Sequence, residues 1–125
     1  MKVLIGIFFL LSSIVLNAEN LVSVEWAPFI KAKGVTDKQL VLAASEVNVE
    51  FLNKQSGFIK RVLMKKSKSE YADVIHWSSK KEAEEAGKKV FSCAKCNEYF
   101  KLMDMKKSAD AGSGFSYYKI LKTWN

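Results

Sequence analysis

The chain has 125 residues, of which 20 are Lys or Arg and 13 are Asp or Glu, so its formal net charge is +7. This length fits one small domain around one hydrophobic core. Lysine carries almost all of the positive charge and Arg61 is the single arginine; because proteins that read nucleic acids rely on arginine for bidentate contacts, we expect no nucleic-acid partner.

The first 18 residues are typical of a secretory signal peptide. Lys2 gives a positive start, residues 3–16 are almost entirely apolar, and Ala18 is the small residue that signal peptidase requires. The apolar run is shorter than the roughly 20 residues that span a bilayer. We predict cleavage after Ala18, a periplasmic or secreted protein without a stable membrane anchor, and one domain over residues 19–125. An uncleaved N-terminal anchor is the alternative.

Strand and helix signals then alternate along the chain. The stretch "LVSVEWAPFI" alternates apolar and polar residues as a strand does. Pro28 predicts that this strand ends or reaches an edge, because proline cannot donate to a sheet. Thr36 and Gln39 predict a capping box at the start of a helix, and Gly57 stands where that helix should end.

The second half of the chain repeats the pattern in a different order. The stretches "FIKRVLMKK" and "EYADVIHW" predict two strands joined by the polar turn "KSKS". Ser79 and Glu82 predict a capping box for a second helix, and Ser92 predicts the cap of a second segment of it. "KKSADAGSG" is typical of a loop and "FSYYKILKTW" of a last strand. This order predicts an α+β, ferredoxin-like βαββαβ domain, an antiparallel sheet with its helices on one face.

Both faces of the predicted sheet carry apolar side chains. The last strand divides its large residues between the faces, with Phe115, Tyr117 and Leu121 on one and Tyr118, Ile120 and Trp124 on the other. Two helices cover only one face, and the other is too apolar to be left in water. We therefore predict that a second copy covers it, giving a homodimer; a different partner protein is the alternative.

The stretch "ADVIHWSSKKEAEEA" resembles the strand, serine cap and alanine-rich helix of the dimeric α/β-barrel, antibiotic-biosynthesis-monooxygenase-like (ABM) superfamily. "FLNKQSGFIKR" is similar to the Gly-Phe stretch that leads into its second strand. The resemblance covers roughly residues 21–122 and implies a dimeric α/β barrel with a pocket in each subunit between sheet and helices. Members of the superfamily include cofactor-independent oxygenases of electron-rich aromatic compounds, haem-degrading oxygenases and proteins of no known activity.

Haem degradation in that superfamily relies on an Asn, a Trp and a His on the second helix. Here the single histidine, His76, precedes Trp77 on a predicted strand, so we do not transfer that activity and expect no cofactor. We predict an exported dimeric protein that binds a small apolar or aromatic molecule. The first alternative is a cofactor-independent, monooxygenase-like enzyme with His76 as a base or orienting group; a half-exposed strand residue is the other interpretation of His76.

Candidate pocket residues lie on strands near the middle of the predicted sheet: Ser23, Glu25, Asp73, His76, Trp77, Tyr117 and Tyr118. Each is also compatible with a solvent or dimer-interface position, and alternation alone does not tell which face carries the pocket. Seven aromatic residues, two of them also candidate pocket residues, are spaced as core: Phe51, Trp77, Phe91, Tyr99, Phe100, Phe115 and Tyr117. The alternative interpretation of these aromatic residues is an aromatic-substrate or flavin site.

The two cysteines form the motif Cys93-Ala94-Lys95-Cys96. Asn97 follows where c-type haem attachment requires histidine. The remaining interpretations are a metal site shared with His76 and a carboxylate, a redox pair near a helix start, or a structural pair that is either a local disulfide or two buried thiols. We favour the structural pair and expect no metal; a redox or metal-binding protein is the second alternative function.

Overall fold

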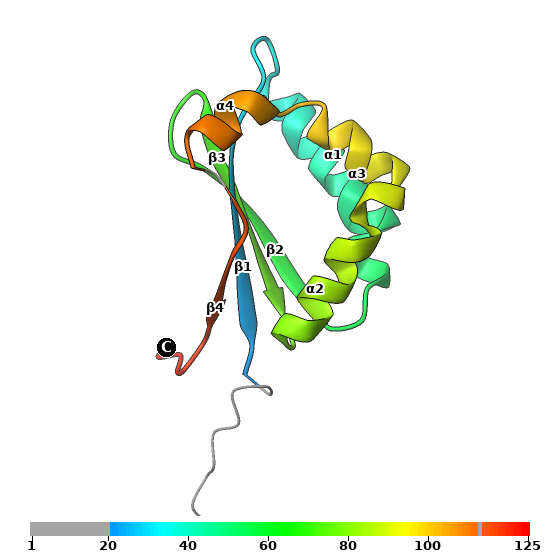
Figure 1. Ribbon diagram of the computed structural model, residues 1–125, viewed down its shortest axis with the longest axis vertical. Coiled ribbons are helices and arrows are strands. Elements are labelled where there is room, and N and C mark those ends of the chain that lie inside the picture. The colour runs from blue at the N-terminus through cyan, green and yellow to red at the C-terminus, as the bar shows by residue number, and fades with distance from the viewer. Residues whose placement is uncertain (1–20, 113) are drawn as a thin grey trace, which may run out of the picture.

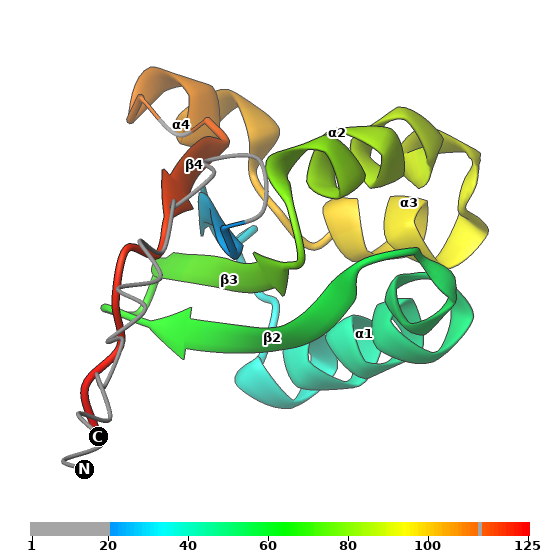
Figure 2. The ribbon, with the colours of Figure 1, turned by 90° about the horizontal axis from the view of Figure 1, so that it is seen from below.

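The structure is a computed structural model that describes residues 21–112 and 114–125. The predicted signal peptide, residues 1–18, lies outside the described residues. The chain forms a four-stranded antiparallel sheet in the order β2-β3-β1-β4, with helices against one face (Figures 1 and 2). This arrangement confirms the predicted α+β, ferredoxin-like fold. Within residues 21–112 and 114–125, no helix has the length and apolar character needed to cross a membrane.

The strands are β1 (Ser23–Ile30), β2 (Phe58–Lys65), β3 (Glu70–Trp77) and β4 (Ser116–Lys119). The helices are α1 (Asp37–Glu50), α2 (Lys80–Lys89), α3 (Ala94–Phe100) and α4 (Met105–Asp110), with the short 3-10 turns η2 (Leu52–Lys54) and η3 (Val90–Ser92). Helices α1, α2 and α3 lie over the sheet, whereas α4 lies at its end (Figure 1).

Strand β1 lies in the middle of the sheet, yet it tolerates Pro28. Its pairing with β3 runs from end to end, whereas its pairing with β4 stops at Trp26. Two residues beyond Pro28, the N–H of Ile30 points away from β3 and donates to Ser108 Oγ on α4 at 2.9 Å. Because backbone groups repeat every second residue, the nitrogen of Pro28 faces the same side, where no strand follows. The expected edge is therefore present, although the strand continues past it.

The first predicted capping box is confirmed and the second is half formed. Gln39 N–H donates to Thr36 Oγ1 at 3.2 Å, and Thr36 N–H donates to Gln39 Oε1 at 2.9 Å. At α2, Glu82 N–H donates to Ser79 Oγ at 3.2 Å. The Glu82 carboxylate instead accepts from Ser56 Oγ at 3.3 Å, which ties α2 to the turn before β2.

That turn contains Gly57, whose φ of +80° is the left-handed conformation expected where the first helical segment ends. A β-carbon at this position would also collide with the side chain of Glu82. The turn therefore has two reasons to require glycine.

Three predictions in the second half of the chain differ from the structure. The expected loop in "KKSADAGSG" contains most of α4, whose first turn is capped by Asp104 accepting from Lys107 N–H at 2.9 Å. The last strand is shorter than predicted because β1, its partner, begins at Ser23 opposite Lys119. Ser92 does not cap a helix: it ends η3, and the N-cap of α3 is Cys93.

The core lies between the sheet and helices α1, α2 and α3. Its central buried residues come from every layer: Phe29, Leu40, Val47, Phe51, Tyr71, Ile75, Trp77, Ala83, Ala86 and Tyr99. Ala83 and Ala86 are small enough to let α2 pack closely on the sheet. The side chains of Ser23, Glu25 and Phe29 point to this helix-covered face, because they pair with core residues of β3.

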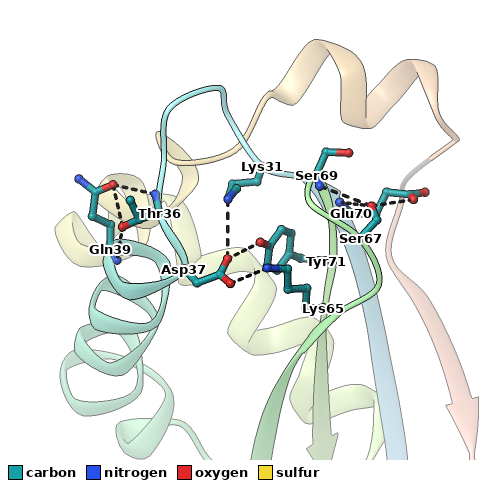
Figure 3. A network of polar contacts seen from close by, with 9 residues as sticks. All are labelled: Lys31, Thr36, Asp37, Gln39, Lys65, Ser67, Ser69, Glu70 and Tyr71. Carbon is teal, nitrogen blue, oxygen red and sulfur yellow. Dashed lines mark hydrogen bonds and ion pairs between the residues drawn. The ribbon is translucent and has the colours of Figure 1, made fainter.

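A polar network fixes the start of α1 to the end of the sheet (Figure 3). The Asp37 carboxylate accepts from the Tyr71 hydroxyl and from Lys65 Nζ at 2.6 Å, and it lies 3.7 Å from Lys31 Nζ. Hydrogen bonds from Lys65 and Tyr71 lower the pKa of Asp37 to about 2. Asp37 and Lys65 are exposed whereas Tyr71 is buried in the core, so we assign the network a positioning role at the end of the sheet.

The opposite face of the sheet is not covered by the described helices (Figure 2). We call it the open face. It carries side chains of all four strands, among them Val24, Trp26, Val62, Met64, Val74 and Tyr118. Val62 and Met64 are 43% and 40% exposed and Tyr118 is 60% exposed.

Candidate functional site

A cavity of about 120 Å³ lies between the sheet and the helices. We call it the sheet–helix cavity. Its lining includes all seven aromatic residues that the sequence spaces as core: Phe51, Trp77, Phe91, Tyr99, Phe100, Phe115 and Tyr117. Phe91 and Phe115 are 74% and 65% exposed, so these two form the rim of the cavity and not part of the core. Apolar walls with a few polar groups are typical of small-molecule sites.

Glu25 is the charged group that β1 places in the cavity wall. Its side chain is directed toward the helices because residue 25 pairs with Ile75 on one side and Tyr117 on the other, and only 8% of Glu25 is exposed. Burial raises the pKa of Glu25 above its ordinary value, which hydrogen bonding by Tyr117 partly offsets. The Tyr117 hydroxyl donates to Glu25 Oε1 at 3.3 Å.

Two further polar groups beside Glu25 are incompletely satisfied. The Trp77 indole N–H also favours the ionised Glu25 carboxylate, although it meets no acceptor in hydrogen-bond geometry within the described part of the chain. Ser23 Oγ is fully buried and likewise has no partner among the described residues. Burial and the Glu25 carboxylate raise the pKa of Tyr117 to about 12, so Tyr117 remains a donor at neutral pH.

The two other charged groups of the cavity wall, Arg61 and Asp73, find their hydrogen-bond partners within the protein. Arg61 Nε on β2 lies 2.7 Å from Asp73 Oδ1 on β3, and the Tyr99 hydroxyl of α3 donates to Asp73 Oδ2 at 2.8 Å. Arg61 Nη1 donates to the carbonyl of Ala44 at 2.9 Å and to Asn48 Oδ1 at 3.0 Å, both on α1.

The same network joins the sheet to helices α1 and α3. The Arg61 guanidinium also lies 4.9 Å from the centre of the Tyr99 ring. Burial and the Asp73 carboxylate raise the pKa of Tyr99 far above its usual range, which keeps its hydroxyl protonated. Because Arg61 and Asp73 neutralise each other, Glu25 is left as the excess charge of the cavity wall.

The structure brings together four of the predicted pocket residues and separates three. Glu25, Asp73, Trp77 and Tyr117 line the sheet–helix cavity. Ser23 shares their face of the sheet without lining the cavity, while His76 and Tyr118 lie on the open face. Alternation explains the separation of His76 from Trp77, since adjacent strand residues point to opposite faces.

His76 therefore does not line the sheet–helix cavity, where the first alternative function would require it. It pairs with Val24 on one side and Lys60 on the other, and burial followed by the charge of Lys60 lowers its pKa. Its Nδ1 is buried and has no hydrogen-bond partner in the described structure.

Sequence reasoning missed Arg61 as a site residue and assigned Tyr99 only to the core. Arg61 stands next to Lys60 in a basic stretch, which suggests a solvated surface. The available signal was strand alternation: Arg61 and Asp73 each fall on the helix-facing register of their strands. Tyr99 does lie in the core, but its hydroxyl completes the buried network.

Cys93 and Cys96 form a disulfide, with their Cα atoms 5.2 Å apart. Cys93 Sγ also accepts from Cys96 N–H at 3.1 Å, and so it takes the capping role that we had assigned to Ser92. Cys96 is buried and lines the sheet–helix cavity. In residues 21–112 and 114–125, no three or more His, Cys, Asp or Glu side chains are grouped so as to hold a metal ion.

Together the fold and the cavity define a ferredoxin-like α+β protein with an aromatic-lined pocket between sheet and helices. No protein-family model matches the chain, and no curated protein matches its sequence. Similar solved structures do exist. A variant of SnoaB, a cofactor-independent oxygenase from Streptomyces nogalater, aligns over 81% of this chain and 95% of its own, with a TM-score of 0.59 and 13% identity.

A protein of unknown function from Nitrosomonas europaea aligns over 86% of this chain and 96% of its own, with a TM-score of 0.54 and 9% identity. At these identities the likeness shows a shared fold. The alignments span nearly the whole of both neighbours.

Proposed function

We propose that this protein binds a small aromatic or similarly apolar molecule, about the size of one ring, in the sheet–helix cavity. The observation that carries the proposal is a cavity of about 120 Å³ whose wall contains seven aromatic residues. A dry protein cavity of about 150 Å³ lined by apolar side chains binds benzene, so this volume is of the right order for a single ring. The exposed rings of Phe91 and Phe115 mark the access route.

Toluene is a suitable probe because it tests the aromatic wall without a polar group. Titration followed by amide and indole NMR should give saturable shifts at Trp77 and Phe51 and none at Val41, which lies on the exposed side of α1. Ala27→Leu should weaken binding by filling the cavity next to Asp73. Absence of shifts up to the solubility limit of toluene would remove the proposal.

A second candidate function is oxidation of an aromatic ligand by dioxygen without a bound cofactor. Its support is the shared fold with SnoaB, together with the aromatic-lined cavity. Oxygen uptake with a hydroquinone should be abolished when Ala27→Leu fills the cavity. His76→Ala should leave the rate unchanged, because His76 lies on the open face; a lost rate in His76→Ala would contradict this placement of the chemistry.

We propose further that the biological unit is a homodimer formed through the open face. Val62 and Met64 project from β2 on this face, beside half-buried Trp26 and Val74 of the neighbouring strands, and a second sheet would bury all of them. Val62→Glu/Met64→Glu should therefore halve the mass measured by sedimentation or light scattering. The control is Val41→Glu on α1, which should leave the mass unchanged; a monomeric wild-type protein would refute the dimer.

For the N-terminus, we propose export of the protein with cleavage after Ala18. It is supported by the Cys93–Cys96 disulfide, because disulfides persist mainly in oxidising compartments. Mass spectrometry of the protein recovered from its native cells should give Glu19 as the first residue. An intact N-terminus there would contradict cleavage.

A further inference from the structure

We propose that Glu25 is the anchor for a hydroxyl group on the ligand, so that the cavity selects phenol-type molecules over purely apolar rings of the same shape. The inference rests on the proposed binding function and specifies its ligand class. It depends on three features of the cavity wall: which charge is left over, which acceptor positions are free, and where they lie.

Glu25 is the charged residue of the cavity wall that has no ion-pair partner among the described residues. Three charged side chains line the cavity, and two of them, Arg61 and Asp73, form a buried ion pair at 2.7 Å. The other donors of Arg61 are directed to α1, toward Ala44 and Asn48. Among the described residues no ion pair includes Glu25, so a group that interacts with its carboxylate is most readily supplied by a ligand.

Glu25 also has unused acceptor capacity. An ionised carboxylate offers about four lone-pair positions. The hydroxyl of Tyr117 occupies one of them at 3.3 Å, which is longer than the usual 2.7–2.8 Å of an O–H···O bond. Because only 8% of Glu25 is exposed, bulk water does not freely fill the remaining lone-pair positions. A buried acceptor left open in this way favours any ligand that brings a donor.

The position of Glu25 gives the ligand its orientation. Glu25 and Tyr117 face each other across β1 and β4, and Trp77 and Ile75 stand on the next strand in the same wall. A single ring held among Phe51, Trp77 and the rim aromatics would thus direct one substituent toward the Glu25 carboxylate. A hydroxyl fits better than an ammonium group, because a neutral donor loses far less hydration on entering an apolar cavity.

The test compares p-cresol with p-xylene, which have nearly the same shape and differ by one hydroxyl. A hydrogen bond to a charged group contributes about 1.5–3 kcal/mol, so p-cresol should bind the wild-type protein about 10- to 100-fold more tightly, measured by calorimetry or NMR titration. In Glu25→Leu the preference should fall below about threefold, while p-xylene still binds. Tyr117→Phe is the matched control: it removes the hydroxyl that donates to Glu25, leaves the Trp77 indole N–H in place, and should retain the preference.

The outcomes separate this inference from the binding function. If p-xylene and p-cresol bind the wild-type protein equally, the role of Glu25 is refuted and the aromatic cavity stands. If neither molecule binds, both proposals fail. Tighter binding of benzylammonium than of p-cresol would also overturn the inference, because it would assign the cavity to cationic ligands. Glu25→Leu should remain folded, since it removes a buried charge that has no ion-pair partner in the described structure.

Discussion

The buried pair of Arg61 and Asp73 should dominate the stability of the folded chain. We consider the substitution Arg61→Met, which keeps much of the apolar stem and removes the guanidinium. Only 5% of the Arg61 side chain and 8% of the Asp73 side chain are exposed. The substitution therefore leaves Asp73 as a buried carboxylate whose remaining strong partner is the hydroxyl of Tyr99.

The magnitude follows from the cost of an uncompensated buried charge. Removing one partner of such a pair destabilises proteins by about 3–5 kcal/mol. Ala44 and Asn48 lose their hydrogen-bond donor at the same time, which adds about 1 kcal/mol or more. Since small domains unfold with about 5–15 kcal/mol, we expect Arg61→Met to lose a large part of the total stability.

Urea denaturation followed by tryptophan fluorescence measures this loss as a lower midpoint with an unchanged slope. Lys88→Met is the matched control, because Lys88 pairs with Glu85 on the exposed surface of α2, and it should leave the midpoint unchanged. Arg61→Met/Asp73→Asn should be less destabilised than the sum of the single variants, by about 1–3 kcal/mol. A midpoint for Arg61→Met that corresponds to a loss below about 1 kcal/mol would refute the reasoning.

Three other predictions concern protons and the disulfide. Because burial raises the pKa of Glu25 above 4.5, the contribution of Glu25 to folding stability is complete below pH 4.5 and is lost as pH rises. The urea midpoint of the wild type should therefore fall relative to that of Glu25→Gln between pH 4 and 8, and a constant difference would contradict this. The pKa of Asp37 is lowered to about 2, so its contribution is present above pH 3.8 and is lost as pH falls toward 2. Asp37→Asn should be less stable than the wild type in thermal unfolding at pH 6, and the difference should shrink as pH falls through about 2, whereas a gap of the same size at pH 6 and pH 2 would oppose the assignment. Reduction of Cys93–Cys96 should cost at most about 2 kcal/mol, because the loop that it closes is so short; complete unfolding by reductant would show a larger role.

Local chemistry made most of the fold predictable. The capping box at Thr36, the left-handed Gly57 and the strand alternation each specify a local structure without help from the rest of the chain. Two of the three failures involve contacts that are distant in sequence. Helix α4 has a local cap at Asp104 but is also held by Ser108, whose Oγ accepts from the N–H of Ile30 across the fold, and the length of β4 depends on where β1 begins. The third failure is local, because the N-cap of α3 is Cys93 and not the preceding Ser92.

The candidate site was predictable in its composition and not in its orientation. Alternation along β3 puts Asp73 and Trp77 on one face and His76 on the other, although all three were candidate pocket residues. It left open which group faces the helices, because the open face of this sheet is as apolar as the covered one. Only the packing of α1, α2 and α3 decides that, and with it whether His76 or Glu25 belongs to the cavity.

On β1, the side chains that face the helices are not the apolar ones that a half-covered sheet leads us to expect. In a half-covered sheet, the apolar side of β1 should face the helices, yet Val24 and Trp26 face outward while Ser23 and Glu25 face inward. Each buried polar group without a full set of partners costs about 1–3 kcal/mol, so stability alone would favour apolar residues at both positions. Sequences depart from local rules chiefly at functional or strained sites. The inward position of Glu25, beside a ring-sized cavity and unpaired among the described ion pairs, is therefore better explained by the ligand that we propose for the cavity than by what holds the sheet together.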